Sequence, residues 1–164
     1  MFEYRVTKYD PKKRDGTGAF IADDWTSQTQ IGQTFGSVVL TAAQYHSTED
    51  AYVKAALAFL RESAGESLRV VHLENHDRHE ESGLALRQGV ILHPPEIDRV
   101  CRLNLRGTIW CKLEDDAGRF IHFGYDYYMY VGVPTPCQGS KALARDLNLF
   151  VEEFRSPYHG TENH

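Results

Sequence analysis

The alternation of apolar and polar positions is most strand-like in the last third of the chain. Three runs dense in β-branched and aromatic residues occupy positions 108–113, 119–123 and 127–133. Such side chains pack well on a pleated surface, so each run predicts a strand. The acidic segment that ends at Gly118 has the residues of a hairpin turn, and Gly124 with its two successors predicts a second turn. Together these features predict an antiparallel meander.

The alternation within the meander assigns its faces. Phe120 and His122 share one face of their strand, and Ile121 lies on the other. Both faces carry large side chains, so we expect one face to pack on helices and the other to be covered or to bind a partner. Tyr128 and Tyr130 suit a binding surface, because tyrosine combines a large contact area with a polar end.

The rest of the chain changes between strand and helix periodicity. Further strands are predicted at 2–9, 37–40, 68–73 and 84–92. Helices are predicted at 41–65, 95–107 and 140–154. We expect a break in the first helix near Ser47, a glycine end at Gly65, and Ser140 as the cap of the last helix. The order strand, helix, strand up to position 73 indicates a crossover connection.

These elements predict an α+β protein with a single domain over residues 1–156. A mainly antiparallel sheet, with the meander near its C-terminal end, is expected to pack against two or three helices. Residues 157–164 have no periodic pattern and predict a flexible tail. The length of 164 residues and the hydrophobic content of 41% are sufficient for one core.

The charge balance narrows the classes of partner. A formal net charge of −5 argues against a general nucleic-acid binder and against an anionic membrane surface, and it is compatible with a basic protein partner. No apolar run approaches the roughly 18 residues of a membrane span, and the N-terminus lacks the order of a signal peptide. The 3 cysteines are widely spaced, as in a reduced protein. We therefore expect a cytoplasmic location.

Motifs for catalysis or cofactor binding are absent from the sequence: it contains no GxSxG, no P-loop and no dinucleotide-binding glycine pattern. His122 and Asp126 could transfer protons if they met in a cleft, which leaves a small hydrolase or nuclease as the alternative function. His72, His76 and His79 lie among carboxylates, so a zinc or nickel site is an alternative to a solvated loop. The preferred prediction is a protein without enzymatic activity, metal or cofactor.

Binding to another protein is the function that these observations favour. Acidic pairs would meet a basic partner, with aromatic side chains at the centre of the contact. The predicted partner-binding residues are Asp23, Asp24, Trp25, Glu80, Glu81, Asp115, Asp116, Asp126, Tyr128 and Tyr130. Trp25 has a competing interpretation as a core residue, and a homodimer formed through the aromatic face is a further alternative.

Four segments of the chain resemble a family of small, mostly uncharacterised bacterial proteins. They are YRVTKYDP at 4–11, WTS at 25–27, IWCKLE at 109–114 and IHFGYDYYMY at 121–130. In size and character this family is similar to the immunity proteins of bacterial toxin systems. The resemblance covers most of the chain apart from residues 72–86. It implies a protein that neutralises a toxin by occluding its active site, and it assigns no site residues.

Overall fold

The computed structural model describes residues 1–75 and 84–160. Its α-helices are α1 (Ala42–Glu62), α2 (Pro94–Leu105) and α3 (Gln138–Asp146). Short 3-10 helices occupy Pro11–Lys13 and Gln28–Gln30. The strands are β1 (Phe2–Thr7), β2 (Thr34–Phe35), β3 (Val38–Val39), β4 (Leu68–Asn75), β5 (Ile91–Leu92), β6 (Ile109–Glu114), β7 (Phe120–Phe123), β8 (Met129–Val133) and β9 (Phe150–Glu153).

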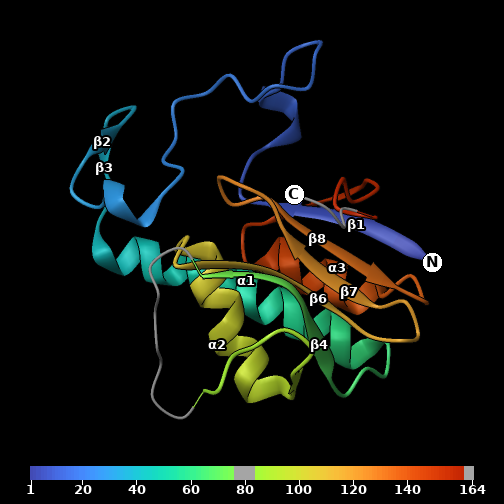
Figure 1. Ribbon diagram of the computed structural model, residues 1–164. Coiled ribbons are helices and arrows are strands. Elements are labelled where there is room, and N and C mark those ends of the chain that lie inside the picture. The colour runs from blue at the N-terminus through green and yellow to red at the C-terminus, as the bar shows by residue number, and fades with distance from the viewer. Residues whose placement is uncertain (76–83, 161–164) are drawn as a thin grey trace.

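Seven of these strands form one sheet in the order β5-β4-β6-β7-β8-β1-β9. Its pairings between described strands are antiparallel, and the first strand of the chain lies between β8 and β9. The α-helices of the described residues lie against one face of the sheet (Figure 1). The predicted α+β domain, with its antiparallel meander packed on helices, is confirmed.

The two faces of the meander differ in chemistry. The inner face, turned toward the helices, carries almost completely buried side chains: Ile109, Cys111, Leu113, Ile121, Phe123, Met129, Val131 and Val133. On the outer face the register places His122 beside Tyr130 and Phe120 beside Gly132. The pleat produces this separation, because successive side chains of a strand point to opposite sides.

A C-terminal strap, residues 154–160, lies across the outer face, where the sequence predicts a flexible tail from residue 157 onward. The ring of Tyr158 packs near the indole of Trp110, with ring centroids 5.7 Å apart. The ammonium of Lys112 donates a hydrogen bond to the carbonyl of Tyr158 at 3.1 Å. Because these partners are distant in sequence, the pattern of residues within the tail does not predict the contacts.

Helix α1 is continuous, without the predicted break near Ser47, and it begins at a capping box opened by Thr41. Its C-terminal end also differs from expectation. Ala64, rather than Gly65, adopts the left-handed backbone, with φ of 60°. Gly65 is needed for close packing instead, because a Cβ at this position would lie 2.3 Å from Cδ1 of Leu60.

The predicted helix over 140–154 is wrong in its second half. Helix α3 ends at Asp146, and Asn148 turns the chain with a left-handed φ of 65°. Strand β9 then pairs with the free edge of β1. The spacing of apolar residues in so short a segment fits both a helix and a strand. The strand forms because it pairs with backbone N–H and C=O groups at the edge of β1 that would otherwise lack hydrogen-bond partners.

Three local predictions fail because tertiary contacts decide the structure. Ser140 does not cap α3, since Cys137 occupies the N-cap position and the Glu62 carboxylate of α1 accepts a 2.8 Å hydrogen bond from the Ser140 backbone. Strand β3 pairs with β2 in a separate two-stranded sheet, so the predicted crossover to β4 does not form. Within the predicted strand at 84–92, only β5 is regular.

Glu49 of α1 has a carboxylate with no exposed surface. Arg106 donates two hydrogen bonds to it at 2.8 and 2.7 Å, Arg102 donates one at 3.1 Å, and the Tyr45 hydroxyl donates one at 2.6 Å. Burial alone would raise the pKa of Glu49, but hydrogen bonds from Arg106, Tyr45 and Arg102 hold this pKa below its ordinary value. The cluster joins α1 to α2.

Glu49→Gln should lower the free energy of unfolding by about 3 kcal/mol, because it leaves arginines facing a neutral amide in a buried site. Urea denaturation near neutral pH measures this loss. Since the pKa of Glu49 is depressed, the advantage of the wild type should disappear as pH falls below the ordinary value of 4.5. Asp50→Asn is the matched control, because Asp50 is 46% exposed and contacts the same Arg102; its loss should stay below about 1 kcal/mol. Equal losses would contradict the central role of Glu49.

Candidate functional site

A hollow of about 380 Å³ lies between the hairpin arm, residues 23–40, and the start of α1. The arm carries the β2–β3 hairpin, which projects from the body of the domain (Figure 1). The residues that line the hollow are Asp23, Asp24, Trp25, Phe35, Val38, Leu40, Gln44, Ser47 and Thr48. Three of the predicted partner-binding residues, Asp23, Asp24 and Trp25, therefore lie together at one site.

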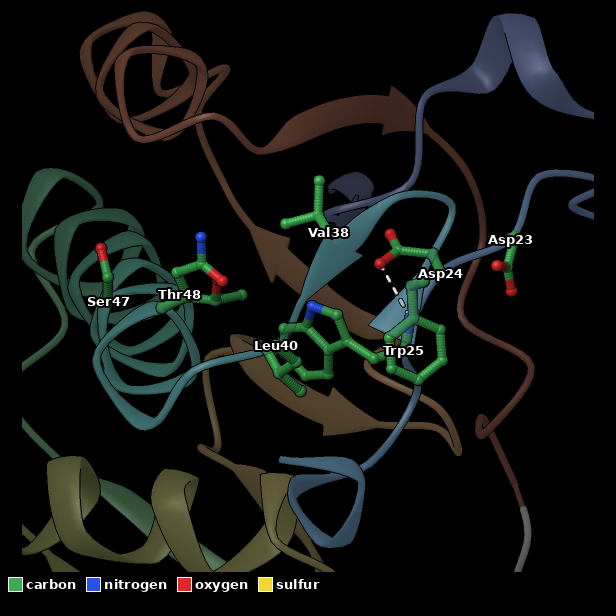
Figure 2. A pocket seen from close by; sticks show the side chains of 9 residues that line it. Asp23, Asp24, Trp25, Val38, Leu40, Ser47 and Thr48 are labelled. Carbon is green, nitrogen blue, oxygen red and sulfur yellow. Dashed lines mark hydrogen bonds between the residues drawn. The ribbon is translucent and has the colours of Figure 1, made fainter. Parts of the chain in front are cut away.

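Trp25 forms the inner wall of the hollow. Its side chain is packed against Tyr45 and Tyr127, with ring centroids 5.5 and 4.9 Å away, and only 8% of the residue is exposed. Figure 2 shows the indole pointing from the arm toward the first turns of α1, where Ser47 and Thr48 lie. Trp25 is thus a core residue that offers its remaining surface to the hollow.

The two carboxylates have different environments. Asp23 is exposed, and its Oδ2 accepts a 2.7 Å hydrogen bond from the backbone of Gly36 at the hairpin turn. Asp24 accepts a hydrogen bond from the backbone of Trp25 and lies 2.8 Å from the ammonium of Lys8. Because Lys8 offsets the charge of Asp24, Asp23 supplies the net negative charge at the rim of the hollow.

Lys8 is a buried cation directly behind this wall. Its side chain is 7% exposed, and its ammonium lies 4.4 and 4.1 Å from the ring centroids of Tyr9 and Trp25. Burial lowers the pKa of Lys8 to about 8, although the hydrogen bond and charge of Asp24 act in the opposite direction. This pair attaches the arm to the end of β1.

The arm adds exposed apolar surface to the acidic rim. Val38 is 58% exposed and lines the hollow, while its neighbour Val39 is 49% exposed and does not line it. Gly36, with φ of 59°, provides the left-handed residue that turns the hairpin. The hollow therefore offers an apolar wall beside a carboxylate, which suits a side chain with an apolar stem and a cationic end.

The turn between β7 and β8 lies at the same end of the molecule. Asp126 and Tyr127 both have left-handed backbones, with φ of 61° and 69°. The Tyr9 hydroxyl donates a 2.6 Å hydrogen bond to the carbonyl of Asp126 and also reaches the carbonyl of Trp25 at 3.5 Å. The Tyr9 hydroxyl therefore links the backbones of Asp126 and Trp25, but the exposed side chain of Asp126 does not line the hollow.

The acidic pair Asp115–Asp116 does not belong to this site. It lies in the turn between β6 and β7, at the opposite end of the meander strands from Asp126. The Asp115 carboxylate accepts hydrogen bonds from the backbone and guanidinium of Arg119. Asp116 is exposed and pairs with Arg69 at 3.0 Å. The predicted acidic residues thus form separate surfaces.

The predicted aromatic surface is largely covered by the chain itself. Tyr130 is 7% exposed beneath the C-terminal strap, and its ring packs near those of Phe154 and Tyr158. Tyr128 is partly exposed, and its hydroxyl accepts a 2.7 Å hydrogen bond from Arg14. The remaining predicted residues, Glu80 and Glu81, lie outside the described residues.

His122 and Asp126 are not brought together as a catalytic pair. His122 has no exposed surface, and its ring nitrogens contact Glu114 at 2.9 Å and Ser156 at 2.7 Å. Asp126 faces solvent on the turn beyond the end of β7. A general base has to reach a substrate, and a sealed histidine with both ring nitrogens engaged cannot do so. The hydrolase alternative therefore gains no support from this geometry.

Over residues 1–75 and 84–160, no group of three or more His, Cys, Asp or Glu side chains is placed to hold a metal ion. His72 adopts a left-handed φ of 55° at the bulge between β4 and β6, and His76 and His79 lie outside the described residues. None of the helices in the described ranges is long and apolar enough to cross a membrane.

Comparisons with protein-family models, with curated proteins and with solved structures find no match to this chain. The geometry of the hollow is therefore the basis for a functional proposal. Sequence reasoning missed six of its lining residues: Phe35, Val38, Leu40, Gln44, Ser47 and Thr48. One signal in the sequence could have indicated them: Val38 and Val39 follow the turn residue Gly36 in a hairpin too short to bury both valines.

Lys8→Met should remove a pH-dependent part of the stability. Unfolded lysine keeps its proton up to the ordinary value of 10.5, whereas Lys8 in the fold loses it near a pKa of about 8. The unfolded state binds more protons between these values, so stability rises with pH there. From about pH 7.5 to 9.5 the wild type should gain about 2 kcal/mol relative to Lys8→Met in urea denaturation. The exposed Lys54 provides a control, and the same gain relative to Lys54→Met would contradict the assignment.

Proposed function

We propose that this chain is a non-enzymatic protein-binding protein that receives a basic side chain of its partner in the hollow at the hairpin arm. The observation that carries the proposal is the combination of Asp23, exposed Val38 and the indole of Trp25 around one hollow of about 380 Å³. An apolar stem can pack on the valine and the indole while its cationic end meets the carboxylate.

The rest of the hollow supports the same chemistry. Gln44, Ser47 and Thr48 on α1 add hydroxyl and amide groups opposite the arm. Such groups can hydrogen-bond the partner's backbone or the nitrogen atoms of a guanidinium. Large rigid aromatic side chains with neighbouring charges are typical centres of protein interfaces.

The particular function that we propose is that of a cytoplasmic immunity protein, which occludes the active site of a bacterial toxin. The resemblance of the four sequence segments to a family with this character motivates the choice. The net charge of −5 adds support, because a toxin domain that acts on nucleic acid presents a basic surface. An acidic protein that covers such a surface also associates rapidly through electrostatic steering.

Val38→Arg should weaken binding to the product of the neighbouring gene by about 30-fold, because it places a bulky cation at the centre of the contact. Isothermal titration calorimetry measures the dissociation constants of the two purified proteins. Val39→Arg is the matched control: it makes the same change in the same strand at a residue that does not line the hollow. Val39→Arg should raise the dissociation constant by less than about threefold, as expected for a residue at the rim of an interface.

Two results would contradict the proposal. If the wild type binds the neighbouring product no more tightly than about 1 µM, the immunity function loses its support. If Val38→Arg and Val39→Arg weaken binding equally, the hollow is not the contact. An inhibition assay with the toxin's own substrate tests occlusion separately from binding.

A further inference from the structure

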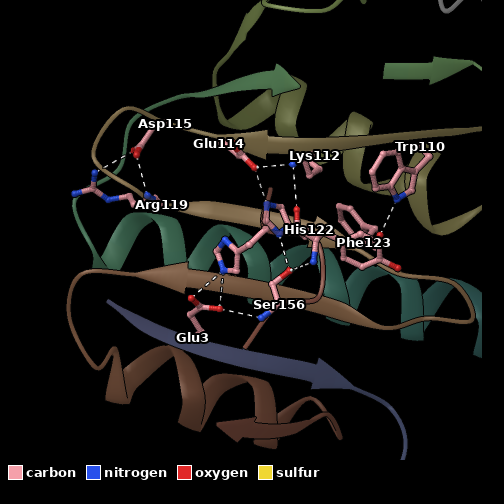
Figure 3. Close-up of polar contacts among 11 residues, drawn as sticks. Glu3, Trp110, Lys112, Glu114, Asp115, Arg119, His122, Phe123 and Ser156 are labelled. Carbon is pink, nitrogen blue, oxygen red and sulfur yellow. Dashed lines mark hydrogen bonds and ion pairs between the residues drawn. The ribbon is translucent and has the colours of Figure 1, made fainter. Parts of the chain in front are cut away.

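The C-terminal strap is attached to the outer face by contacts with three different strands. The backbone N–H of Ser156 donates a 2.9 Å hydrogen bond to the carboxylate of Glu3 on β1. The Ser156 hydroxyl contacts His122 on β7, and Lys112 on β6 binds the carbonyl of Tyr158. In Figure 3, Ser156 lies between Glu3 and His122 and is joined to each of them by a hydrogen bond.

His122 is the central group of this attachment. Its Nε2 lies 2.9 Å from Oε1 of Glu114, and its Nδ1 lies 2.7 Å from Oγ of Ser156. The hydrogen bond with His122 and the charge of Lys112 hold the pKa of Glu114 below its ordinary value against its partial burial, so the carboxylate accepts only. Nε2 therefore carries the proton, and Nδ1 accepts the Ser156 hydroxyl. Hydrogen positions follow here from the bonding partners.

Ser156 completes the hydrogen-bond network that runs from Glu114 through His122 to the strap. Its Oγ accepts a 3.2 Å hydrogen bond from the backbone of Tyr158 while its own proton points to Nδ1 of His122. Each donor therefore has an acceptor only while His122 is neutral. If Nδ1 gains a proton, it becomes a donor to Oγ, which already accepts from the Tyr158 backbone, and the Ser156 hydroxyl proton is left without its acceptor.

A charge on His122 would also be poorly accommodated. The residue has no exposed surface, and its ring stacks on Phe120 with centroids 4.1 Å apart. Glu114 and Lys112 of β6 face it from one side, and His159 of the strap lies with its ring centroid 5.7 Å away. Burial lowers the pKa of His122, Glu114 opposes this shift, and the positive charges of Lys112 and His159 add to it.

We propose that the strap formed by residues 154–160 opens in mild acid when His122 takes up a proton, which uncovers the aromatic outer face around Trp110 and Tyr130. The strap is then a conformational switch that the fold contains, independent of the hollow at the hairpin arm. In the closed form Tyr158 contacts both of these aromatic side chains.

The direction of the pH dependence follows from linkage. The pKa of His122 is depressed in the closed form, so the open form binds the proton more readily below the ordinary value of 6.5. Closure is therefore complete above this pH and weakens as pH falls. Glu3, whose pKa is held low by His159 and the Ser156 backbone against partial burial, adds a further loss only below about 4.5.

One contact acts against opening. The ring of His159 lies 2.9 Å from the Glu3 carboxylate, and a protonated His159 would strengthen this pair. The pair is solvent-accessible, with His159 at 35% exposure, so solvent screens it and its contribution to closure is small. His122 has no exposed surface, so solvent does not screen its charge in the same way, and burial lowers its pKa despite the opposing effect of Glu114. The His122 effect therefore decides the direction.

Hydrogen exchange of the Ser156 and Tyr158 amides tests the proposal. The measurement runs from about pH 7.5 to about pH 5, and an unstructured peptide corrects for the intrinsic pH dependence of exchange. Below pH 6.5 the protection factors of both amides should fall by up to about tenfold per pH unit, which is the largest slope that uptake of one proton allows. Amides of α1 should keep their protection over the same range. Unchanged protection of Ser156 and Tyr158 at about pH 5 would overturn the proposal.

Two variants identify the titrating group. His122→Asn keeps an acceptor oxygen facing Ser156 but does not titrate, so strap protection should no longer depend on pH. Ser156→Ala removes the attachment while His122 remains, so the Tyr158 amide should be less protected already near neutral pH. The exposed His46 of α1 is the control, and His46→Asn should behave as the wild type. If His122→Asn keeps the full pH dependence, or if only His159→Asn abolishes it, His122 is not the switch.

Discussion

The position of the hollow at the hairpin arm depends on the contacts of the buried Glu49 carboxylate. This carboxylate joins α1 to α2 through Arg102 and Arg106, and it accepts a hydrogen bond from the hydroxyl of Tyr45. The Tyr45 hydroxyl in turn accepts a hydrogen bond from Tyr127, whose ring contacts the indole of Trp25. A continuous line of contacts therefore runs from a core ion cluster to the wall of the hollow. Buried groups of this kind fix geometry when every member is satisfied.

The turn that carries Tyr127 is held by hydroxyl groups from elsewhere in the chain. Asp126 and Tyr127 are consecutive residues with left-handed backbones, a conformation that costs about 1 kcal/mol or more for a residue such as tyrosine. The Tyr9 and Tyr52 hydroxyls donate to the carbonyls of these two residues at 2.6 and 2.7 Å. These bonds offset the cost, so the surroundings of the hollow are formed before any partner arrives.

The parts of the fold that were predictable are those fixed by local sequence. The meander follows from β-branched and aromatic runs, and α1 follows from the helical periodicity over 41–65. The strap and β9 were not predictable, because Ser156 bonds to Glu3 across 153 positions of sequence and β9 forms only when β1 offers an edge. Only three of the nine residues that line the candidate site were predicted from the sequence. Asp23, Asp24 and Trp25 can be recognised in the sequence as two carboxylates beside a large aromatic residue. Val38 becomes a candidate only because the structure shows that it is exposed.

The aromatic outer face shows why chemical character alone does not locate a binding surface. Tyr130 and Trp110 have the area and polar ends typical of an interface, and the protein uses them to hold its own C-terminal strap. A non-titrating amide at position 122 could satisfy Ser156 and would leave this contact indifferent to pH. The imidazole of His122 makes the same hydrogen bonds but couples them to one proton. In the proposed switch the cover over the aromatic face depends on the charge of His122, whereas the hollow at the hairpin arm is lined by other residues.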